Sequence, residues 1–455
     1  MHRFAAVLIA LLFSCQSSAD EAGAPAAPPV KKTAKRALLI TIDTLRADVL
    51  GAYGGPALTP ELDRWAAEGW RFTQAYSASM LTNPSHSSIL TSLYPRDHGV
   101  YDNQSGVGDS LRTLPGELGR RGTASGAVVA FPHLNPNVAN LARGFDRFVP
   151  ATRKERRAKR QVELALAELD SMGTDQFFFW LHIGDPHAPY APILEHRAVR
   201  KPVTAMSEAQ AASPGFQKKN PWFRKAFKKH RYAETLYDLY VAEVEAVDRA
   251  LASLRSTLEA RGLWDETLVV VTSDHGEGFG EHGMWFHHGG LYDETVNVPL
   301  IIRGPGVSAA VDDRLVEHVD IAPTIVDLLG APRWEPMRGR SLVAQRSGDA
   351  TARDFAFSEH MLAQAVSVRD GEWLQVLHRK SSRQFPSYPF IAGNRELWRR
   401  MPHGAMVQVR PQDFPEEAAR LRLAMEEYLG AGLTLHARRA IGQDRESLRE
   451  LGYIE

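Results

Sequence analysis

Thr82 lies in a short polar segment whose residue types suit nucleophilic chemistry at the start of a helix. The segment reads MLTNPSHSSILTS from Met80 to Ser92. Proline is favoured in the first turn of a helix, and a small polar residue commonly caps that turn. Free N–H groups and the positive end of the helix dipole would then face an oxyanion bonded to the Thr82 hydroxyl. An ordinary capped surface helix is the competing interpretation.

Acidic and histidine side chains follow several predicted strands at the same end. The apolar runs at 37–42, 124–130, 177–183, 268–272 and 298–302 are typical of buried strands. Ligands bind at the carboxyl ends of strands in open α/β sheets. The groups near those strands are Asp43, His133, Asp185 with His187, Asp274 with His275, and His288 in a His-rich loop. Each histidine alone fits an ordinary loop residue, but together they indicate a metal-assisted hydrolytic site.

The composition indicates a globular protein with no global charge. The chain has 455 residues, 44% of them hydrophobic, with 54 basic and 54 acidic side chains. Because the formal net charge is zero, no overall field attracts nucleic acid, and we predict no nucleic-acid partner. The single cysteine, Cys15, excludes a disulfide or a thiolate metal site in the folded body.

The N-terminus has the pattern of an export signal. A short basic start precedes an apolar run from Phe4 to Phe13 that is too short to span a bilayer permanently. The following Ser14-Cys15 resembles the lipobox of bacterial lipoproteins, which predicts a signal at 1–15 and lipidation of Cys15; cleavage near Ala19 is the alternative. Residues 16–36 are then expected to be a flexible tether. We therefore expect an exported protein anchored to a membrane in the cell envelope.

Strand and helix patterns alternate from residue 37 to about 345 and weaken afterwards. Helices are expected at 60–69, 153–172 and 232–260 in the first part, and the alternation favours a parallel sheet covered on both faces. Short strands at 355–357, 365–368 and 373–377, an irregular stretch, and a helix at 416–428 predict a smaller α+β subdomain over 346–455. Trp373, Tyr388 and Trp398 are expected to pack internally, with a substrate cleft as the alternative. The basic run at 218–231 is interpreted as a solvated face.

Several ordered motifs resemble the sulfatase family of the alkaline phosphatase superfamily. They are IDTLRAD from Ile42, TPELDR from Thr59, the Pro84-Ser85 helix with LYP from Leu93 and HGV from His98, DPH from Asp185, SDHGE from Ser273, LYD from Leu291 and VPL from Val298. The resemblance covers about 37–342, and the ending at 451–453 is similar to bacterial members. It implies a metal-dependent hydrolase of sulfate or phosphate esters. The fold it implies is alkaline-phosphatase-like and doubly wound, with a mostly parallel sheet and a smaller C-terminal α+β subdomain.

The resemblance assigns roles to individual residues. Asp43 matches the first acid of the family's acidic pair, whose second member is Thr44 here, and Asp274 with His275 match the later metal pair. His187 and His133 match histidines at the ester site. Three family cations are replaced: the arginine of the nucleophile motif by His86, one lysine by Phe131, and another lysine by His288. His86, His187 and His288 are therefore the expected substrate-binding groups.

Thr82 occupies the position at which sulfatases carry the cysteine or serine that becomes formylglycine. Threonine cannot become an aldehyde, so we expect no formylglycine. A threonyl phosphoryl intermediate, however, can be attacked at phosphorus by water or by an alcohol. Related phosphoethanolamine transferases and nucleotide phosphodiesterases are similar in using threonine. The favoured hypothesis is therefore attack by Thr82 on a phosphomonoester or phosphodiester.

The predicted cofactor is one divalent metal ion held by Asp43, Thr82, Asp274 and His275. A histidine ligand favours zinc or manganese, with calcium as an alternative, and a second ion through Asp185 and His187 remains open. His187 or His288 would protonate the leaving group, and His133 would orient it. The expected substrate is a small-molecule, glycan-linked or lipid-linked ester. A true sulfatase and an inactive binding protein are the rival interpretations.

Overall fold

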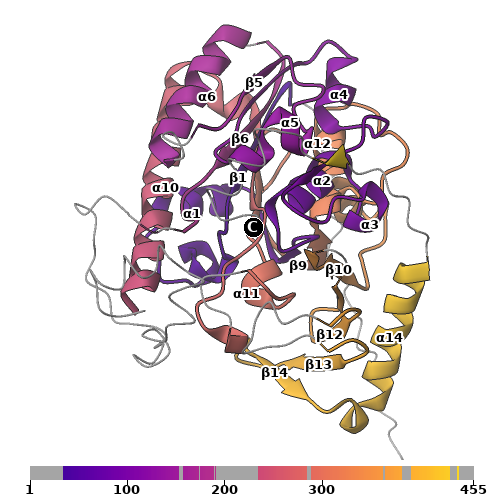
Figure 1. Cartoon of the computed structure of the whole chain (residues 1–455). Helices are drawn as coiled ribbons and strands as arrows, with labels where there is room; N and C mark the ends of the chain where they lie inside the picture. The colour runs from indigo at the N-terminus through magenta and orange to yellow at the C-terminus, as the bar shows by residue number, and fades with distance from the viewer. Residues whose placement is uncertain are drawn as a thin grey trace, which may run out of the picture.

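The chain folds around two β-sheets of unequal size (Figure 1). This computed structural model describes residues 34–152, 157–173, 175–188, 190, 234–283, 288–361, 364–381, 391–430 and 438–439. The larger sheet has eight strands in the order β5-β4-β6-β1-β7-β8-β2-β9. The smaller has five, in the order β10-β11-β12-β13-β14. The predicted signal, Cys15, most of the tether, the basic run and Tyr388 lie outside the described residues.

The centre of the large sheet matches the predicted buried strands. β1 (Arg36–Ile42) is buried throughout and pairs in parallel with β6 (Phe177–Ile183) and β7 (Thr267–Ser273). The strand begins at Arg36, one residue before the predicted apolar run. The register aligns Ile42 with Ile183 and Ser273, so the residues that follow these three strands emerge at one edge of the sheet. β4 (Ala124–Val128) and β5 (Arg147–Val149) extend the sheet in parallel.

The far side of this sheet departs from the predicted parallel pattern. β8 (Leu300–Arg303) runs antiparallel to both β7 and β2 (Trp70–Tyr76). β9 (Ala310–Glu317), which no sequence pattern indicated, pairs in parallel with β2 at the edge. Its burial is uneven, and three consecutive charged residues, Asp312 to Arg314, divide its apolar residues, so the strand contains no continuous apolar run.

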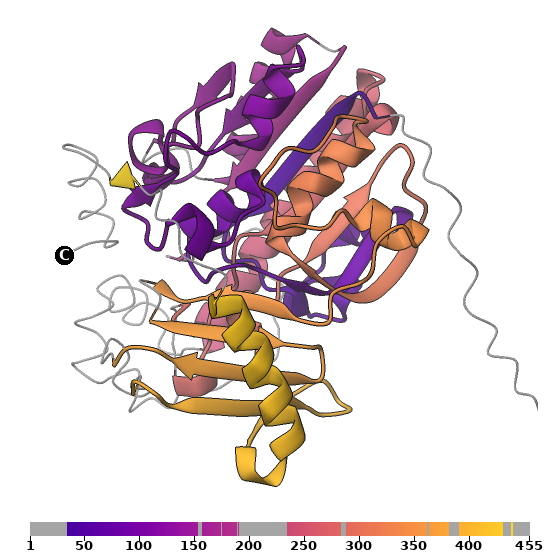
Figure 2. The ribbon, with the colours of Figure 1, turned by 90° about the vertical axis from the view of Figure 1, so that its right-hand side faces the viewer.

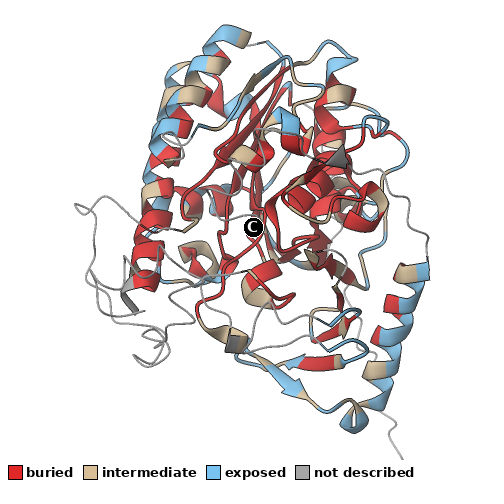
Figure 3. Cartoon of the chain, viewed as in Figure 1, coloured by how far each residue is buried: buried red, intermediate tan, exposed pale blue. Residues whose placement is uncertain are grey.

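Helices cover both faces of the large sheet because alternate residues of its strands point to opposite sides. On one face α1 (Pro60–Glu68), α6 (Ala158–Met172) and α10 (Glu234–Ala260) pack on Leu38, Ile40 and their neighbours. On the other face α2 (Thr82–Thr91), α4 (Leu114–Gly119) and α12 (Ile321–Leu328) pack on Leu39 and its neighbours. The central strands β1, β6 and β7 are consequently buried throughout (Figure 3), whereas the edge strands are partly exposed.

The C-terminal part is an antiparallel sheet with one helix across it (Figure 2). Its strands are β10 (Ala356–Glu359), β11 (Ala365–Arg369), β12 (Trp373–His378), β13 (Arg395–Arg400) and β14 (Met406–Val409), and the helix is α14 (Pro415–Gly430). The last two strands lie where an irregular stretch was predicted. Trp373 and Trp398 are buried in apolar clusters, in agreement with the packing interpretation.

Short elements complete the described residues. They are α3 (Pro95–His98), α5 (Pro136–Ala139), α11 (Asp293–Val296), α13 (Leu342–Ser347), β3 (Ser105–Gly106) and β15 (Arg438–Arg439), with 3-10 turns at Ala47–Val49, Gly51–Tyr53, Pro132–Leu134, Trp264–Glu266, Glu281–Gly283, His318–Asp320 and Pro411–Asp413. Among the helices of the described ranges, none combines the length and the apolar character needed to cross a bilayer.

Candidate active site

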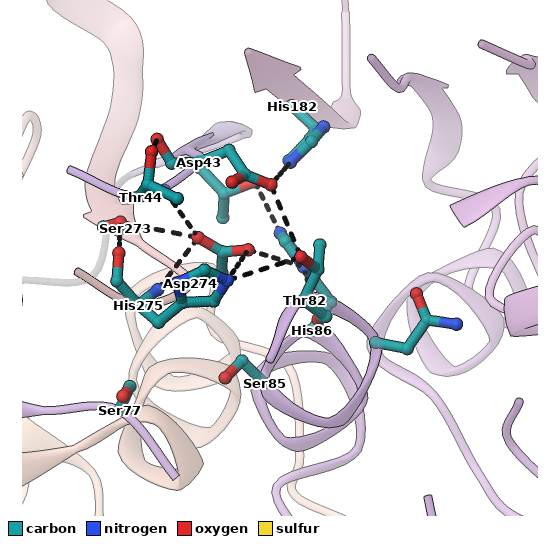
Figure 4. A network of polar contacts seen from close by, with 12 residues as sticks. Asp43, Thr44, Ser77, Thr82, Ser85, His86, His182, Ser273, Asp274 and His275 are labelled. Carbon is teal, nitrogen blue, oxygen red and sulfur yellow. Dashed lines mark hydrogen bonds and ion pairs between the residues drawn. The ribbon is translucent and has the colours of Figure 1, made fainter. Parts of the chain in front are cut away.

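The strand ends bring two acids and a histidine together in the interior of the protein. Asp43 follows β1, and Asp274 and His275 follow β7; all three side chains are fully buried. One ligand atom from each lies within 4.8 Å of the others. Figure 4 shows the three side chains converging from adjacent loops. The sequence prediction that these residues meet at one edge of the sheet is therefore confirmed by the geometry.

Thr82 faces this cluster from the first residue of α2. Its Oγ1 lies 3.5 Å from Asp43 Oδ2 and 3.4 Å from His275 Nε2 (Figure 4). A helix does begin here, but its N-cap residue is Leu81 and no side chain caps it, so the predicted polar cap is wrong. Thr82 is itself helical, which leaves its hydroxyl free to face the acids.

The first turn of α2 offers fewer free N–H groups than the sequence suggested. The Asn83 amide donates to Asn103 Oδ1 at 2.9 Å, Pro84 has no N–H, and the Ser85 amide donates to Leu81 O at 3.1 Å. The positive end of the helix dipole still faces Thr82. Anion binding at this point therefore depends less on backbone donors than a free helix start would imply.

The atoms that converge on Thr82 fit a divalent cation. Among the described residues, Asp43 Oδ1 and Asp274 Oδ2 are buried without a hydrogen-bond partner. His275 Nδ1 donates to the Gly276 carbonyl at 2.9 Å, which leaves the Nε2 lone pair directed into the site. Buried unpaired carboxylate oxygens are costly unless a cation compensates them. Two carboxylates, an imidazole and a hydroxyl form a donor set suited to zinc or manganese.

Thr44 does not replace the missing second acid as a ligand. Its hydroxyl donates to the Asp43 carbonyl at 2.7 Å, and its amide donates to Asp274 Oδ1 at 3.2 Å. The residue has a φ of 55°, a left-handed conformation that is unusual for a β-branched side chain. Thr44 therefore holds the loop that carries Asp43 against Asp274.

Burial and proximity shift the protonation of the cluster in the metal-free protein. Burial raises the pKa of Asp43 well above its ordinary value, and the adjacent Asp274 raises it further. Burial likewise raises the pKa of Asp274. Burial, with His288 nearby, lowers the pKa of His275 well below the usual range and keeps its ring neutral. A neutral imidazole beside two carboxylates is the protonation state that a metal ion requires.

Three predicted histidines line the space beyond the cluster. The His288 ring lies 4.2 Å from the His275 ring and 6.1 Å from the His187 ring, measured between centroids. Phe131 stacks on His133 at 5.4 Å and contacts His187 at 4.9 Å. His187 and His288 are half-buried, whereas His133 is fully buried. His187 and His288 are therefore better exposed than His133 for contact with a substrate.

His86 is placed differently from its predicted substrate-binding role. Its side chain is fully buried, Nδ1 donates to the Thr82 carbonyl at 2.9 Å, and Nε2 lies 2.9 Å from Thr41 Oγ1. Trp180 Nε1 also donates to that Thr41 oxygen, so the Thr41 hydroxyl is left to donate to His86 Nε2. With both nitrogens engaged, His86 supports the start of α2 and has no free atom for a substrate.

Asp185 has a structural role that disfavours a second metal ion. Its Oδ2 accepts from the Ala158 amide at 3.0 Å at the start of α6, and its Oδ1 accepts from Arg157 at 3.2 Å. Both oxygens are thus used inside the protein. The alternative in which Asp185 and His187 bind a second ion does not agree with this geometry.

The C-terminal sheet supports the segment that leads into Thr82. The Ser358 hydroxyl donates to Ser77 O at 2.7 Å, and the Ser79 hydroxyl donates to Glu359 O at 2.8 Å. The Glu359 amide donates to Ala78 O at 2.9 Å. β10 is therefore hydrogen-bonded to the residues just before α2, although almost three hundred residues separate the two segments.

The family comparison agrees with the geometry. The model of the sulfatase family matches residues 35–331. The chain belongs to the sulfatase family. An N-acetylglucosamine-6-O-sulfatase of Bacteroides thetaiotaomicron is 24% identical and covers 82% of this chain and 84% of its own length. The multifunctional alkaline phosphatase superfamily protein PehA of Trinickia caryophylli is 25% identical, covering 68% of this chain and 77% of its own.

Solved structures share the fold of this sulfatase-family chain. BT4656, in complex with its substrate D-glucosamine-2-N,6-O-disulfate, has a TM-score of 0.68 with 19% identity and covers 88% of this chain and 98% of its own. The phosphonate monoester hydrolase of Silicibacter pomeroyi has a TM-score of 0.65 with 21% identity, covering 87% and 94%. The α/β core with a small antiparallel C-terminal sheet is thus the alkaline-phosphatase-like fold.

Proposed function

We propose that this chain is a metal-dependent phosphoesterase or phosphoryl transferase that uses Thr82 as its nucleophile. The observation that carries this proposal is the position of Thr82 Oγ1, which lies within 3.5 Å of both Asp43 and His275 in a fully buried polar cluster. A surface helix cap would not need to face a buried cluster of two carboxylates and a histidine. A hydroxyl at this point is therefore better explained as a reacting group.

The identity of the nucleophile favours phosphorus over sulfur. A formylglycine hydrate releases sulfate by collapsing to an aldehyde, and threonine offers no such route. A phosphorylated threonine can instead be resolved by attack at phosphorus. Membership of the sulfatase family is compatible with this chemistry, since a phosphonate monoester hydrolase shares the fold.

Asp43, Asp274, His275 and Thr82 would hold the divalent ion, with zinc or manganese favoured. When bound, the ion would lower the pKa of the Thr82 hydroxyl and offset negative charge on the ester oxygens. Burial of the two carboxylates excludes water that would otherwise compete for them.

The reaction then proceeds in two balanced steps. Thr82 Oγ1, having lost its proton to solvent, forms a bond to phosphorus as the bond to the leaving oxygen breaks, and that oxygen takes a proton from His187 or His288. Water or an alcohol next attacks phosphorus, the bond to Thr82 breaks, and the attacking oxygen passes its proton to the same histidine. His133, stacked on Phe131, orients the leaving group.

The relatives and the N-terminal motif support the proposed substrate class and location. Curated and solved relatives act on sulfated sugars or phosphonate monoesters, so a small-molecule, glycan-linked or lipid-linked ester is the proposed substrate class. The lipobox-like Ser14-Cys15 supports export and a lipid anchor in the cell envelope. Sulfate-ester hydrolysis is the second candidate, favoured by the sulfatase relative that covers most of both chains.

A substrate panel tests this proposal. Purified protein would be given 4-nitrophenyl sulfate, 4-nitrophenyl phosphate and an aryl phosphodiester with zinc, manganese or calcium. Thr82→Ala should abolish metal-dependent phosphoester turnover, while Thr82→Ser, which keeps a hydroxyl, should retain part of it. Thr91→Ala is the matched control because Thr91 lies at the other end of α2, where its hydroxyl donates to Ser87 O at 2.6 Å and accepts from the Leu93 amide at 3.3 Å. Phosphoester turnover that survives Thr82→Ala, or turnover of sulfate alone, would refute the proposal.

A further inference from the structure

His182 is a buried histidine beside the site that the proposed reaction does not use. It is the last but one residue of β6, all of whose remaining residues are apolar, and its side chain is fully buried. A buried polar ring of this kind is costly unless its nitrogens are satisfied. Its neighbours therefore indicate what the ring does.

The backbone fixes the tautomer of His182. The Ala130 amide donates to His182 Nδ1 at 3.2 Å, so Nδ1 presents a lone pair and carries no proton. The single proton of the neutral ring must then be on Nε2. Burial, with His86 nearby, lowers the pKa of His182, in agreement with a neutral ring.

The Nε2 atom of His182 lies close to one oxygen of Asp43, although the two do not meet hydrogen-bond geometry in this structure. Nε2 lies 3.4 Å from Asp43 Oδ2, and Thr82 Oγ1 approaches the same oxygen at 3.5 Å (Figure 4). The other oxygen, Oδ1, has no hydrogen-bond partner among the described residues. The carboxylate thus has one oxygen facing two donors and one oxygen free.

We propose that His182 is a positioning residue that orients Asp43 for metal binding. With a cation bound, Nε2–H would donate to Oδ2 and leave Oδ1, which has no hydrogen-bond partner among the described residues, for the ion. This inference rests on the metal site of the proposed function and adds a residue outside the ligand set. It also explains why a histidine interrupts an otherwise apolar strand.

The same geometry excludes His182 from a second metal site. His86, His182 and Asp274 also lie close enough together to be considered as ligands. However, His182 Nε2 carries a proton and His182 Nδ1 is used by Ala130, while both nitrogens of His86 are bonded to Thr82 and Thr41. Neither ring has a free lone pair. The chain should therefore bind one ion at this location.

The test measures metal affinity and not only activity. The variants are His182→Leu, which removes the donor, and His182→Gln, whose amide offers both an acceptor for Ala130 and a donor for Asp43. His98→Gln is the matched control: His98 is also fully buried with Nδ1 accepting a backbone amide, from Val100 at 3.1 Å, but its Nε2 faces Ser88. Zinc or manganese affinity is measured by chelator competition, with ion content per chain.

We expect His182→Leu to weaken metal affinity by about 10- to 100-fold, as removal of an outer hydrogen-bond partner does in other metal sites. His182→Gln should recover most of that loss, and His98→Gln should leave the affinity unchanged. One ion per chain is expected in every variant. With saturating metal, kcat of the Leu variant should return toward wild type if the ring acts through Asp43.

Three results would overturn this inference. They are unchanged affinity in a folded His182→Leu protein, an equal loss in His98→Gln, and two ions in the wild type with one in the variant. Failure of the proposed function is a separate outcome. If Thr82→Ala kept its phosphoester turnover while His182→Leu still lost metal affinity, the nucleophile would be wrong and the role of His182 would stand.

Discussion

Substituting Asp43 by asparagine should change the stability of the protein in opposite directions with and without metal. In the metal-free protein, burial and the adjacent Asp274 raise the pKa of Asp43, so the folded state holds its proton more tightly than the unfolded state does. Such a group stabilises the fold below its unfolded pKa of about 3.9 and loses that contribution as pH rises through the folded pKa. At neutral pH Asp43 therefore destabilises the metal-free folded state.

The size of the effect follows from this linkage. Each unit of difference between folded and unfolded pKa corresponds to about 1.4 kcal/mol. Asp43→Asn removes the charge, so we expect the metal-free variant at pH 8 to gain on the order of 1 kcal/mol, or roughly 2 °C in melting temperature. With metal at 100 times its dissociation constant, the wild type gains about 2.7 kcal/mol through binding, whereas the variant lacks a ligand. The Asp43→Asn variant should therefore melt above the wild type without metal and below it with metal.

The assay is thermal unfolding between pH 4.5 and 8.5, with EDTA or with excess zinc or manganese. Asp312→Asn is the contrasting control, because hydrogen bonds and charge from Arg314 and Arg346 outweigh burial and lower the pKa of Asp312. Its loss should destabilise the protein at neutral pH in both conditions. The reasoning is refuted if Asp43→Asn melts below the wild type in EDTA at pH 8, or if metal raises both melting temperatures equally.

Three further changes test other parts of the structure. His288→Gln should reduce turnover of alkyl esters by about 10²- to 10⁴-fold and turnover of 4-nitrophenyl esters far less, because only poor leaving groups need a proton from the enzyme. The rates of the variant are measured over a series of esters with different leaving groups. An equal loss for all of these esters would contradict the prediction. Asp185→Asn should lower the free energy of unfolding by about 1 kcal/mol in denaturant titration, because it weakens the hydrogen bonds from Arg157 and from the first amide of α6. The metal content of this variant should be unchanged. Gly339→Ala should cost about 1–3 kcal/mol or more in the same titration, because a Cβ would lie 1.7 Å from Val319 O; an unaltered midpoint would count against the described packing.

The sequence was sufficient to predict the strands at the centre of the large sheet and the meeting of Asp43, Asp274 and His275 at its edge. β1, β6 and β7 are mainly apolar strands followed by Asp43, Asp185 and Asp274, and parallel strands of this kind place such residues at one edge. The position of Thr82 could be inferred because proline and family position both indicated a helix start. At the central strands and at the start of α2, the local sequence pattern predicts the same structure that the tertiary packing requires.

Other features depend on contacts that a linear pattern does not encode. The antiparallel direction of β8 is set by its neighbours β7 and β2. β13 and β14 follow a proline-rich stretch whose sequence predicts irregular structure. His86 was assigned to substrate because the family has arginine there, but the partners of its two nitrogens come from β1 and from its own helix. His182 gave one usable signal, a lone histidine inside an apolar strand.

The hydrogen bonds from β10 to residues 77–79 have a consequence for how this protein can be divided or altered. A fragment that ends before residue 346 would leave Ser77 and Ser79 without these bonds, so the approach to α2 would become mobile while the large sheet stayed folded. Removal of the small sheet should then lower activity as a substitution of Thr82 does. Efforts to change the specificity of the enzyme by mutagenesis should accordingly include residues 356–359, far from the metal ligands in the chain.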